Sequence, residues 1–481
     1  MKRRKTIIIL AAVFACLIAV IAIEKAAVRH VDKINTIDEI ITDISPDDVT
    51  AISLKTADGT LDLSLEDGTW QDSSDAAFPI DQDAVSDFLS HFASIHACFV
   101  IDDVADYSPY GLEDPEATVT LTIADADPLI VDLGGYSTMD SQRYVGIGDD
   151  KAYLVEDDLM EYVSVDRNDF MLNDTPPEIT TITDISIQGA NELHIFRDEE
   201  LVCDYNDYSD WFIELDGVNY PLSDSNARTL VQNINGISFT DYTTYTASSE
   251  DLSSYGLTDP SAITITITGK ANDGDDAELN SYTITLGHVV TQEADEENEE
   301  ECSASVRMGE SEIIYSLSPD VYHAIAEADY DSLRPSELLH LDWDTVNGIT
   351  FTLDGIDYEL TRTENNAEDS EDKEADTEQE DEYIWLLGEK EVDISNLKSA
   401  ANALAAESFE SADKGNTQEV AVTFTLDNED YPSVSVALYR YDSADCLALI
   451  NGEQAGLVSR SLMADLKEAC TALTLAADKS E

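Results

Sequence analysis

The chain has 481 residues, of which 102 are acidic and 25 are basic, so its formal net charge is -77. This charge excludes a nucleic-acid partner, because a phosphate backbone would repel the chain and few cations could release counterions. Hydrophobic residues make up 43% of the sequence, which excludes general disorder, and the length predicts about three domains.

The amino terminus has the features of a membrane-targeting segment. A basic cluster at residues 2–5 precedes 17 uncharged residues that run from Ile7 to Ile23. As a helix this run would be about 25 Å long, which is the short end of a membrane span. Because cations in front of such a span stay in the cytoplasm, we expect an uncleaved signal anchor within residues 1–30 and an extracytoplasmic remainder.

Two other interpretations of this segment stay open. Residues 20–22 loosely resemble a signal-peptidase site, which would make the segment a cleaved secretory signal. Residues 13–16 resemble a lipoprotein signal ending at Cys16, although Phe14 is bulky for that pattern. All three interpretations place the rest of the chain outside the cytoplasm, where its acidic surface would keep it soluble and monomeric through self-repulsion.

The first predicted unit covers residues 40–175. Leucines alternate with polar residues at 61–65, which is typical of a strand with one face in water. Between residues 84 and 95, apolar side chains recur at three- and four-residue spacing, which predicts a helix with one buried stripe. The hexapeptide YGLEDP at 110–115 then leads into a predicted strand at 119–123.

The second predicted unit, residues 178–335, repeats this order. The hexapeptide returns as YGLTDP at 255–260, an offset of 145 residues, again before a Thr-rich strand. A helix is predicted at 226–237, and the Leu-Gly strand at 131–134 returns at 284–287. Self-similarity at a fixed spacing is typical of a repeat architecture.

A third, divergent unit is predicted at residues 340–478. It opens with a strand at 346–351, continues with a helix at 395–409, and closes with a helix at 461–473. It has no copy of the hexapeptide. We therefore predict a third repeat from the order of its elements alone.

Two acidic segments interrupt these units. Residues 291–301 lie inside the second unit, and residues 364–382 form a larger insertion inside the third. Both are too highly charged to be buried, so we expect them to be loops. Loop length lowers stability only slowly, so such insertions are tolerated.

A sheet with one solvent-exposed face needs to be packed only on its apolar face. Each unit has a helix with one apolar stripe that can pack there. The fold class is therefore predicted to be α+β, with tandem repeated units behind a single amino-terminal transmembrane helix. Each unit is expected to be a mostly antiparallel sheet with one packed helix.

The repeated hexapeptide is predicted to have a structural role. Glycine permits the positive φ of a tight turn, and proline enters a strand only at its start or on an edge. The tyrosine and leucine would then fix the turn to the core, whereas the alternative is that the tyrosines stack on a ligand. The residues are Tyr110, Gly111, Leu112, Asp114 and Pro115 in the first copy, and Tyr255, Gly256, Leu257, Asp259 and Pro260 in the second.

These features resemble one known family. The apolar amino terminus, the Tyr-Gly-Leu turn before a Thr-rich strand, and the Leu-Gly strand after it are similar to the bacterial domain-of-unknown-function family 4340. The resemblance covers residues 40–335 well and the last unit poorly. It implies a membrane-anchored envelope protein, often encoded beside an ABC exporter of the gliding-motility type, and it supplies no catalytic residues.

Motifs that carry catalytic or metal chemistry are missing from the sequence. The seven histidines form no HExxH pattern, the cysteines form no CxxC pattern, and there is neither a G-x-S-x-G elbow nor a Walker loop. Ser-x-x-Lys occurs at 395–398 and 411–414, but without the companion motifs of penicillin-binding enzymes. We therefore expect no enzymatic activity, no cofactor and no metal centre, and we expect the cysteines to act as small buried hydrophobic residues.

One acidic loop is a candidate for weak divalent-cation binding. Asp273, Asp275, Asp276 and Glu278 cluster around Gly274, but their order differs from that of an EF-hand. We interpret the cluster as a solvated loop, with adventitious cation binding as the alternative.

The sequence therefore predicts a single-pass protein of the cell membrane that is largely extracytoplasmic and has no catalytic role. We expect an accessory or scaffold component with ABC transporter subunits as possible partners, and with no nucleic-acid partner. The alternative is an extracellular glycan- or peptide-binding module that uses aromatic residues in a groove between units. A hydrolase with a dispersed site is a third class, which no local pattern favours.

Overall fold

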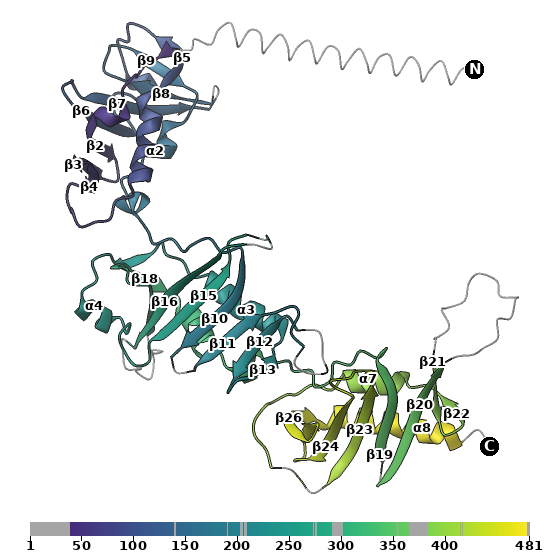
Figure 1. The fold of residues 1–481 in the computed structure, drawn as a ribbon. Coiled ribbons are helices and arrows are strands. Elements are labelled where there is room, and N and C mark those ends of the chain that lie inside the picture. The colour runs from purple at the N-terminus through teal and green to yellow at the C-terminus, as the bar shows by residue number, and fades with distance from the viewer. Residues whose placement is uncertain are drawn as a thin grey trace, which may run out of the picture. The chain divides into compact units, whose positions relative to one another are not determined.

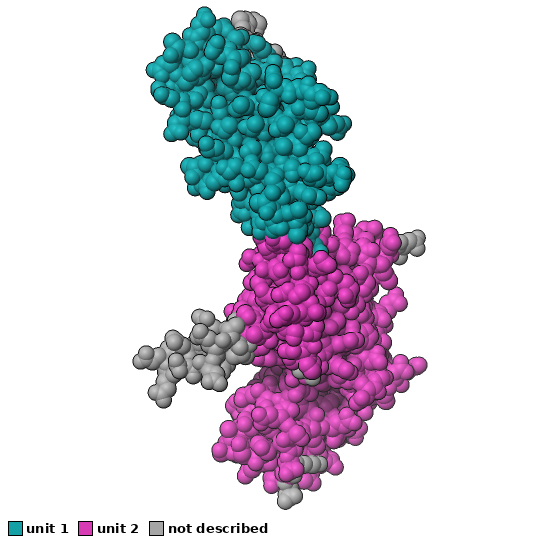
Figure 2. All heavy atoms as spheres, turned by 90° about the vertical axis from the view of Figure 1, so that its left-hand side faces the viewer, with its two compact units in different colours: residues 1–174 teal, residues 175–481 magenta. Residues whose placement is uncertain are grey.

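The computed structural model describes residues 39–478 with short gaps. The gaps are residues 139–140, 190, 203–204, 206–208, 273, 275–276, 291–301, 354, 365–382, 414 and 416. The chain divides into two compact units, residues 1–174 and residues 175–481 (Figure 2).

Several predicted features lie outside the described residues. They are the apolar run at 7–23, the acidic segment 291–301, the segment 364–382 apart from Glu364, and the carboxylates of Asp273, Asp275 and Asp276. Among the residues that the structure describes, no helix has both the length and the apolar character needed to cross a membrane.

The first compact unit is built on one sheet, the first sheet. Its strands are β1 (Glu39–Ile40), β2 (Val49–Thr56), β3 (Thr60–Glu66), β4 (Thr69–Asp72), β5 (His96–Ile101), β6 (Ala117–Ile123), β7 (Leu129–Ser137), β8 (Gln142–Gly146) and β9 (Ala152–Val155). All pairs are antiparallel, in the order β1-β5-β9-β8-β7-β6-β2-β3-β4. Its helices are α2 (Gln82–Ala93) and the 3-10 helices η1 (Pro46–Asp48), η2 (Ser108–Tyr110), η3 (Leu159–Tyr162) and η4 (Arg167–Phe170).

Local sequence patterns explain these elements. In β3, Leu61 and Leu63 are buried while the residues between and before them are exposed, as expected for a strand with one wet face. In α2, the residues at three- and four-residue spacing that include Val85 and Phe92 face the core. The Asp81 carboxylate accepts the N–H groups of Asp83 and Ala84, so this N-cap sets the start of the helix.

The second sheet belongs to the second compact unit. Its strands are β10 (Thr181–Gln188), β11 (Leu193–Arg197), β12 (Trp211–Leu215), β13 (Val218–Pro221), β14 (Tyr242–Thr244), β15 (Ile263–Lys270), β16 (Leu279–Val290), β17 (Cys302–Met308) and β18 (Ile314–Leu317). Their order is β13-β12-β11-β10-β15-β16-β17-β18-β14. Its helices are α3 (Asp224–Asn235), α4 (Ser249–Ser254), α5 (Pro319–Ala326) and α6 (Tyr330–Leu333). Helix α3 contacts α5 and α6, and α5 contacts β17.

The third sheet lies in the same compact unit. Its strands are β19 (Val346–Leu353), β20 (Ile356–Glu364), β21 (Tyr383–Leu387), β22 (Lys390–Val392), β23 (Gln418–Leu426), β24 (Ser433–Arg440), β25 (Asp445–Ile450) and β26 (Glu453–Ser459). Their order is β22-β21-β20-β19-β23-β24-β25-β26. Helices α7 (Ser395–Asn402) and α8 (Arg460–Asp478) pack against each other, and α8 also contacts strands of the sheet.

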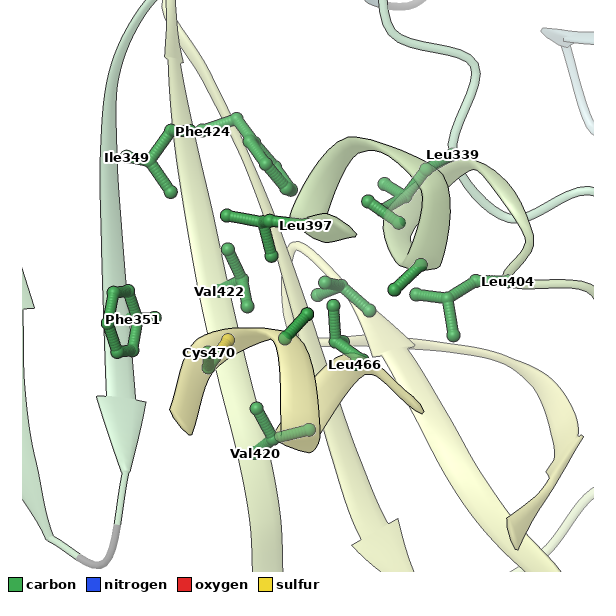
Figure 3. Packing of buried hydrophobic residues seen from close by; sticks show 14 of the residues in the cluster. Leu339, Ile349, Phe351, Leu397, Leu404, Val420, Val422, Phe424, Leu466 and Cys470 are labelled. Carbon is green, nitrogen blue, oxygen red and sulfur yellow. The ribbon is translucent and has the colours of Figure 1, made fainter. Parts of the chain in front are cut away.

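The core of the third sheet shows how the helices are held. Leu466 and Cys470 of α8 and Leu397 of α7 are fully buried among side chains of β19 and β23, including Phe351 and Phe424 (Figure 3). Burial of side chains of this size contributes about 1.5–3 kcal/mol each. The apolar stripes of the two helices therefore fix them to one face of the sheet.

The three sheets share one central strand order and differ in their edge strands (Figure 1). In each, the first long strand lies between the strand that directly follows it and a strand that comes after a helix: β2 lies between β3 and β6, β10 between β11 and β15, and β19 between β20 and β23. The next three strands then follow in chain order, β7 to β9, β16 to β18, and β24 to β26.

The prediction of an α+β fold made mostly of antiparallel sheets is confirmed. The expectation of one packed helix per sheet is too simple, because the second and third sheets carry additional helices. The helix predicted at 395–409 ends at Asn402. Beyond it, Ala405 and Ser408 form β-bridges with Glu337 and Leu457, so their backbone groups are used outside a helix.

Candidate functional site

The first Tyr-Gly-Leu turn packs directly on the Leu-Gly segment of β7. Gly111 has a φ of 69°, in the left-handed region that glycine adopts without strain. A Cβ atom on Gly134 would lie 2.3 Å from the carbonyl oxygen of Tyr110, and one on Gly111 would lie 2.6 Å from the nitrogen of Gly135. Both positions therefore need glycine for the turn to approach the strand.

The second turn makes the same contact with β16. Gly256 has a φ of 70°, and a Cβ atom on Gly287 would lie 2.1 Å from the carbonyl oxygen of Tyr255. A Cβ atom on Gly256 would lie 2.8 Å from the carbonyl oxygen of His288. The Ser305 hydroxyl also donates to the Tyr255 carbonyl at 2.9 Å, which holds the turn against the sheet.

The remaining residues of the two hexapeptide copies differ in burial. Leu257 is buried and Leu112 is half-buried, while the Tyr110 ring lies 5.1 Å from the ring of Tyr144, centroid to centroid. Four motif residues lie away from the glycine contacts, with Pro115 half-buried and the others exposed: Asp114, Pro115, Asp259 and Pro260. Each turn thus uses its glycine and the carbonyl of its tyrosine for backbone packing.

Arg143 on β8 is a buried cation with several partners. Its Nη1 donates to the Gly134 carbonyl at 2.6 Å and to Glu116 Oε2 at 2.7 Å, and its Nε donates to Asp158. Burial raises the pKa of Asp158, but hydrogen bonds from Arg143 and the Met160 N–H, with the charge of Arg143, hold that pKa below its usual value. The guanidinium therefore joins β7, β8 and the start of η3 within the protein.

A histidine on β11 lies between two carboxylates. His194 Nε2 is 2.7 Å from Asp184 Oδ2, and its Nδ1 is 3.3 Å from Glu214 Oε2. Burial lowers the pKa of His194, but its hydrogen bonds and the charges of Asp184 and Glu214 raise it above the ordinary value. Ser186 is the cross-strand neighbour of His194, yet both ring nitrogens are already bonded to carboxylates. The cluster is therefore a cross-strand ion pair and not a serine–histidine catalytic pair.

Two histidines meet beside α5. The His288 ring stacks on Tyr322 at 4.7 Å and lies 5.5 Å from the ring of His323. Nε2 of His288 is buried without a hydrogen-bond partner, and burial and the nearby His323 lower the pKa of His288. Two imidazoles alone make a poor metal site. Across the described part of the chain, no three His, Cys, Asp or Glu side chains gather as metal ligands.

The serine of the Ser-x-x-Lys pattern at 395–398 is the first residue of α7, and it bonds to a carboxylate that lies just before the helix. The Ser395 hydroxyl and N–H both donate to Asp393 Oδ1, at 2.5 and 2.8 Å. The Lys398 ammonium lies 5.4 Å from the centroid of the Trp343 ring. Because the serine hydroxyl donates to a carboxylate and the lysine interacts with an indole, the pair does not form a nucleophile with its base.

Two cysteine thiols are buried, which makes them unreactive as nucleophiles. Cys446 and Cys470 are free thiols that are fully buried. Burial raises the pKa of Cys470 to about 12 and also raises the pKa of Cys446. A thiol with so high a pKa is neither a nucleophile nor a metal ligand at neutral pH.

A groove of about 450 Å³ lies between the second and third sheets, inside the second compact unit. Its lining includes four tyrosine and two proline side chains, beside aliphatic, amide and charged ones. The tyrosines and prolines are Tyr205, Tyr220, Pro221, Tyr330, Pro335 and Tyr431. Open grooves of this size with aromatic walls are a common form of binding site. We call it the tyrosine groove.

Contacts across the base of the tyrosine groove connect the two sheets. The Tyr205 hydroxyl donates to the Leu338 carbonyl at 3.0 Å, and Arg334 Nη2 donates to the Ala455 carbonyl at 2.8 Å. The guanidinium of Arg334 also lies 3.9 Å from the centroid of the Phe409 ring. These contacts shape the groove, and the guanidinium of Arg334 is engaged in two of them.

A second hollow, of about 420 Å³, lies between α7 and α8. Its lining is made of small and acidic residues, including Ala400, Ala403, Asp465 and Glu468. It offers neither aromatic nor basic side chains to a ligand, so the tyrosine groove is the stronger candidate.

Residues 70–194 match a family model described as Domain of unknown function (DUF4340). The match begins in β4, includes the first Tyr-Gly-Leu turn, and ends in β11. The resemblance to this family is therefore confirmed for these residues. No match was found among curated proteins or solved structures.

Proposed function

We propose that the chain is a membrane-anchored, extracytoplasmic protein without catalytic activity. In this proposal it is an accessory or scaffold component associated with an envelope ABC transporter. The basic cluster at residues 2–5, followed by the uncharged run at 7–23, supports the anchor and its orientation. The net charge of -77 supports a soluble body that stays away from anionic lipid headgroups.

The body is proposed to consist of three tandem repeats. The shared central strand order of the three sheets supports this proposal. So does the repeated contact in which Tyr110 packs on Gly134 and Tyr255 packs on Gly287.

The proposal that the protein is not an enzyme rests on the hydrogen bonds within its polar clusters. The reactive atom of a general base or nucleophile must be free to contact the substrate. Arg143, His194 and Ser395 are each bonded to carboxylates of the protein itself. Their interactions join strands and hold the first residue of α7, which favours a structural or binding role.

Tags at the two ends of the full chain test the topology. We expect an epitope after Glu481 to react with a membrane-impermeant reagent on intact cells, while an epitope before Met1 reacts only after the membrane is opened. Equal protection of both epitopes on intact cells would contradict the anchor. A cytoplasmic protein in the same cells controls for lysis.

Cross-linking in intact cells, followed by purification in mild detergent, tests the association with a transporter. We expect transporter subunits to be enriched with the full chain over an unrelated single-pass protein of similar abundance. Recovery of the chain without any transporter subunit, in both cross-linked and untreated cells, would contradict this association.

The tyrosine groove favours a second candidate function, which is a module that binds an extracellular glycan or peptide. Four tyrosines and two prolines line a groove that is open to solvent. Aromatic rings give a large contact area at a low entropic cost. Binding of either ligand class to the purified full chain, lost when Tyr220 is changed to alanine, would support this candidate.

A further inference from the structure

We infer that the tyrosine groove binds an extended, proline-rich peptide segment that carries basic side chains. This inference rests on the second candidate function, and it specifies both the site and the chemistry of the ligand. It follows from the ring surfaces in the groove, the charge of its rim, the exposed edge of β13, and the bonding state of its polar groups.

The ring surfaces fit the polyproline II conformation. Tyr220 and Tyr330 lie 5.4 Å apart, centroid to centroid, with an interplanar angle of 50°, so they form a ridged and not a flat surface. Tyr220 is 38% exposed and Val218, two residues before it on β13, is 51% exposed. Proline-rich segments dock between such aromatic ridges because their backbone is already extended before binding.

The rim of the groove favours a cation. Glu337 and Glu453 line the groove and are exposed, and neither forms an ion pair with another described residue. Arg334 is the basic residue of the lining, but it is stacked on Phe409 and paired with Asp331 at 3.4 Å. The rim therefore presents uncompensated negative charge, and the chain's overall charge would steer a basic segment toward it.

An exposed sheet edge offers backbone bonds to an extended chain. Strand β13 is the edge strand of the second sheet, and it pairs with β12 from Leu215 opposite Val218 to Phe212 opposite Pro221. Because hydrogen-bonded and non-bonded pairs alternate in an antiparallel ladder, the N–H and C=O of Asn219 point away from β12. Proline has no N–H to donate, so only a non-proline residue of an extended peptide along β13 can pair with both groups.

The polar side chains of the groove argue against a sugar. The Gln454 carboxamide donates to the Glu410 carbonyl at 2.8 Å and accepts from the Ala412 N–H at 3.3 Å. Asn451 Oδ1 accepts from the Ser435 N–H at 2.9 Å. A glycan needs many side-chain donors and acceptors, and the Gln454 carboxamide and Asn451 Oδ1 are already engaged within the protein. This leaves mainly the carboxylates of Glu337 and Glu453 as acceptors. A proline-rich peptide needs mainly ring surfaces and a few acceptors.

Fluorescence anisotropy with the full chain in detergent micelles tests this inference. The probe is a short labelled peptide that is rich in proline and flanked by arginines. We expect saturable binding with a Kd in the micromolar range that weakens as salt is raised, because exposed charges are screened. A peptide with alanine in place of proline, and one with glutamate in place of arginine, should bind at least about tenfold more weakly.

Variants locate the site. We expect Tyr220→Ala to weaken binding about tenfold, and we expect Glu337→Gln combined with Glu453→Gln to weaken binding and reduce its salt dependence more than Glu429→Gln does. Tyr441→Ala and Glu429→Gln are matched controls, because both residues are exposed and lie outside the groove lining. These controls should leave the Kd unchanged, and circular dichroism should confirm that every variant is folded.

Three results would overturn the inference. They are the absence of saturable binding up to millimolar peptide, equal binding by the Tyr220→Ala variant, and displacement of the peptide by a neutral chito-oligosaccharide. The last result would assign the groove to glycans. If peptide binding fails while the epitope and cross-linking experiments succeed, the groove inference is wrong and the proposed membrane-anchored scaffold stands.

Discussion

The carbonyl oxygen of Tyr110 lies so close to Gly134 that a Cβ atom on the glycine would be only 2.3 Å away. Tyr255 and Gly287 have the same relationship, with a corresponding distance of 2.1 Å. Both partners are backbone groups, so no change of side-chain rotamer could relieve a clash. The two Tyr-Gly-Leu turns are therefore fixed to β7 and β16 through glycine.

Substitution of these glycines should destabilise the sheet to which each belongs. We expect Gly134→Ala and Gly287→Ala each to lower the local stability by about 2 kcal/mol, since overpacking against backbone forces the turn away from the strand. Hydrogen exchange of peptides from β7 and β16 measures this loss, and exchange should become roughly thirtyfold faster in the affected strand.

Gly59→Ala is the matched control for this prediction. A Cβ atom there would meet only Val165 Cγ2, at 4.0 Å, so the change should have little effect on exchange. If Gly134→Ala and Gly287→Ala behave like Gly59→Ala, the backbone contact is not what holds the turns.

The sequence predicted these turns but not their partners. Glycine followed by leucine, with proline after them, is a local signal that predicts a turn with positive φ. The contact with Gly134 depends on where β7 lies beside the turn, and no local pattern records that. The repeated Leu-Gly in the strand was the available signal, because a glycine inside a strand often marks a close backbone approach.

Non-local contacts also explain the less accurate predictions. The leucine alternation at 61–65 and the apolar stripe of α2 are local, so the strand and the helix were predicted within a few residues. Helix α7 ends early because Ala405 and Ser408 bridge to distant residues. The tyrosine groove combines tyrosines from separate segments, which only the folded chain brings together.

The pKa of His194 should lie above the ordinary histidine value, and the pKa of His288 should lie below it. Asp184 and Glu214 raise the pKa of His194, whereas burial and His323 lower that of His288. Deuterium exchange at the imidazole ring, followed by mass spectrometry over a series of pH values, measures each midpoint. The urea-unfolded chain supplies the reference, which should lie near about 6.5 for both.

The two histidines should therefore affect stability with opposite signs. The contribution of His194 is fully present below the unfolded pKa and is lost as the pH rises through its folded pKa. His288 is held neutral, so it lowers stability as the pH falls from the unfolded pKa to the folded pKa. We expect His194→Gln to remove the first effect without changing the second. A His194 midpoint at or below the unfolded reference would contradict the ion-pair arrangement.

Loss of Arg143 should be far more damaging than loss of its exposed partner. Its side chain is 6% exposed, while that of Glu116 is 53% exposed. We expect Arg143→Met to lower the free energy of unfolding by about 3 kcal/mol, because it removes the guanidinium that donates to the Asp158 carboxylate and the Gly134 carbonyl. Glu116→Gln should cost less than about 1 kcal/mol. Pulse proteolysis in urea measures both.

The Arg143 cluster should also depend on pH. The pKa of Asp158 is held below its usual value, so its stabilisation is present above the unfolded pKa and is lost as the pH falls through the folded pKa. In the Arg143→Met variant this acid sensitivity should decrease. Equal destabilisation by Arg143→Met and Glu116→Gln, with unchanged acid sensitivity, would show that the buried guanidinium does not organise the cluster.

Cys470 should resist alkylation until the third sheet unfolds. It is fully buried against the strands, and burial raises its pKa to about 12, so almost no thiolate exists at neutral pH. Iodoacetamide should leave Cys470 and Cys446 unmodified in the native chain and modify both in urea, as mapped by mass spectrometry. The half-buried Cys98 is an internal comparison.

We also expect Cys470→Ser to lower the free energy of unfolding by about 1–3 kcal/mol, because it buries a hydroxyl group. Cys470→Ala should lower it by less than Cys470→Ser. Rapid alkylation of native Cys470, or equal stability of the serine variant and the parent chain, would contradict the packing of α8 on the sheet.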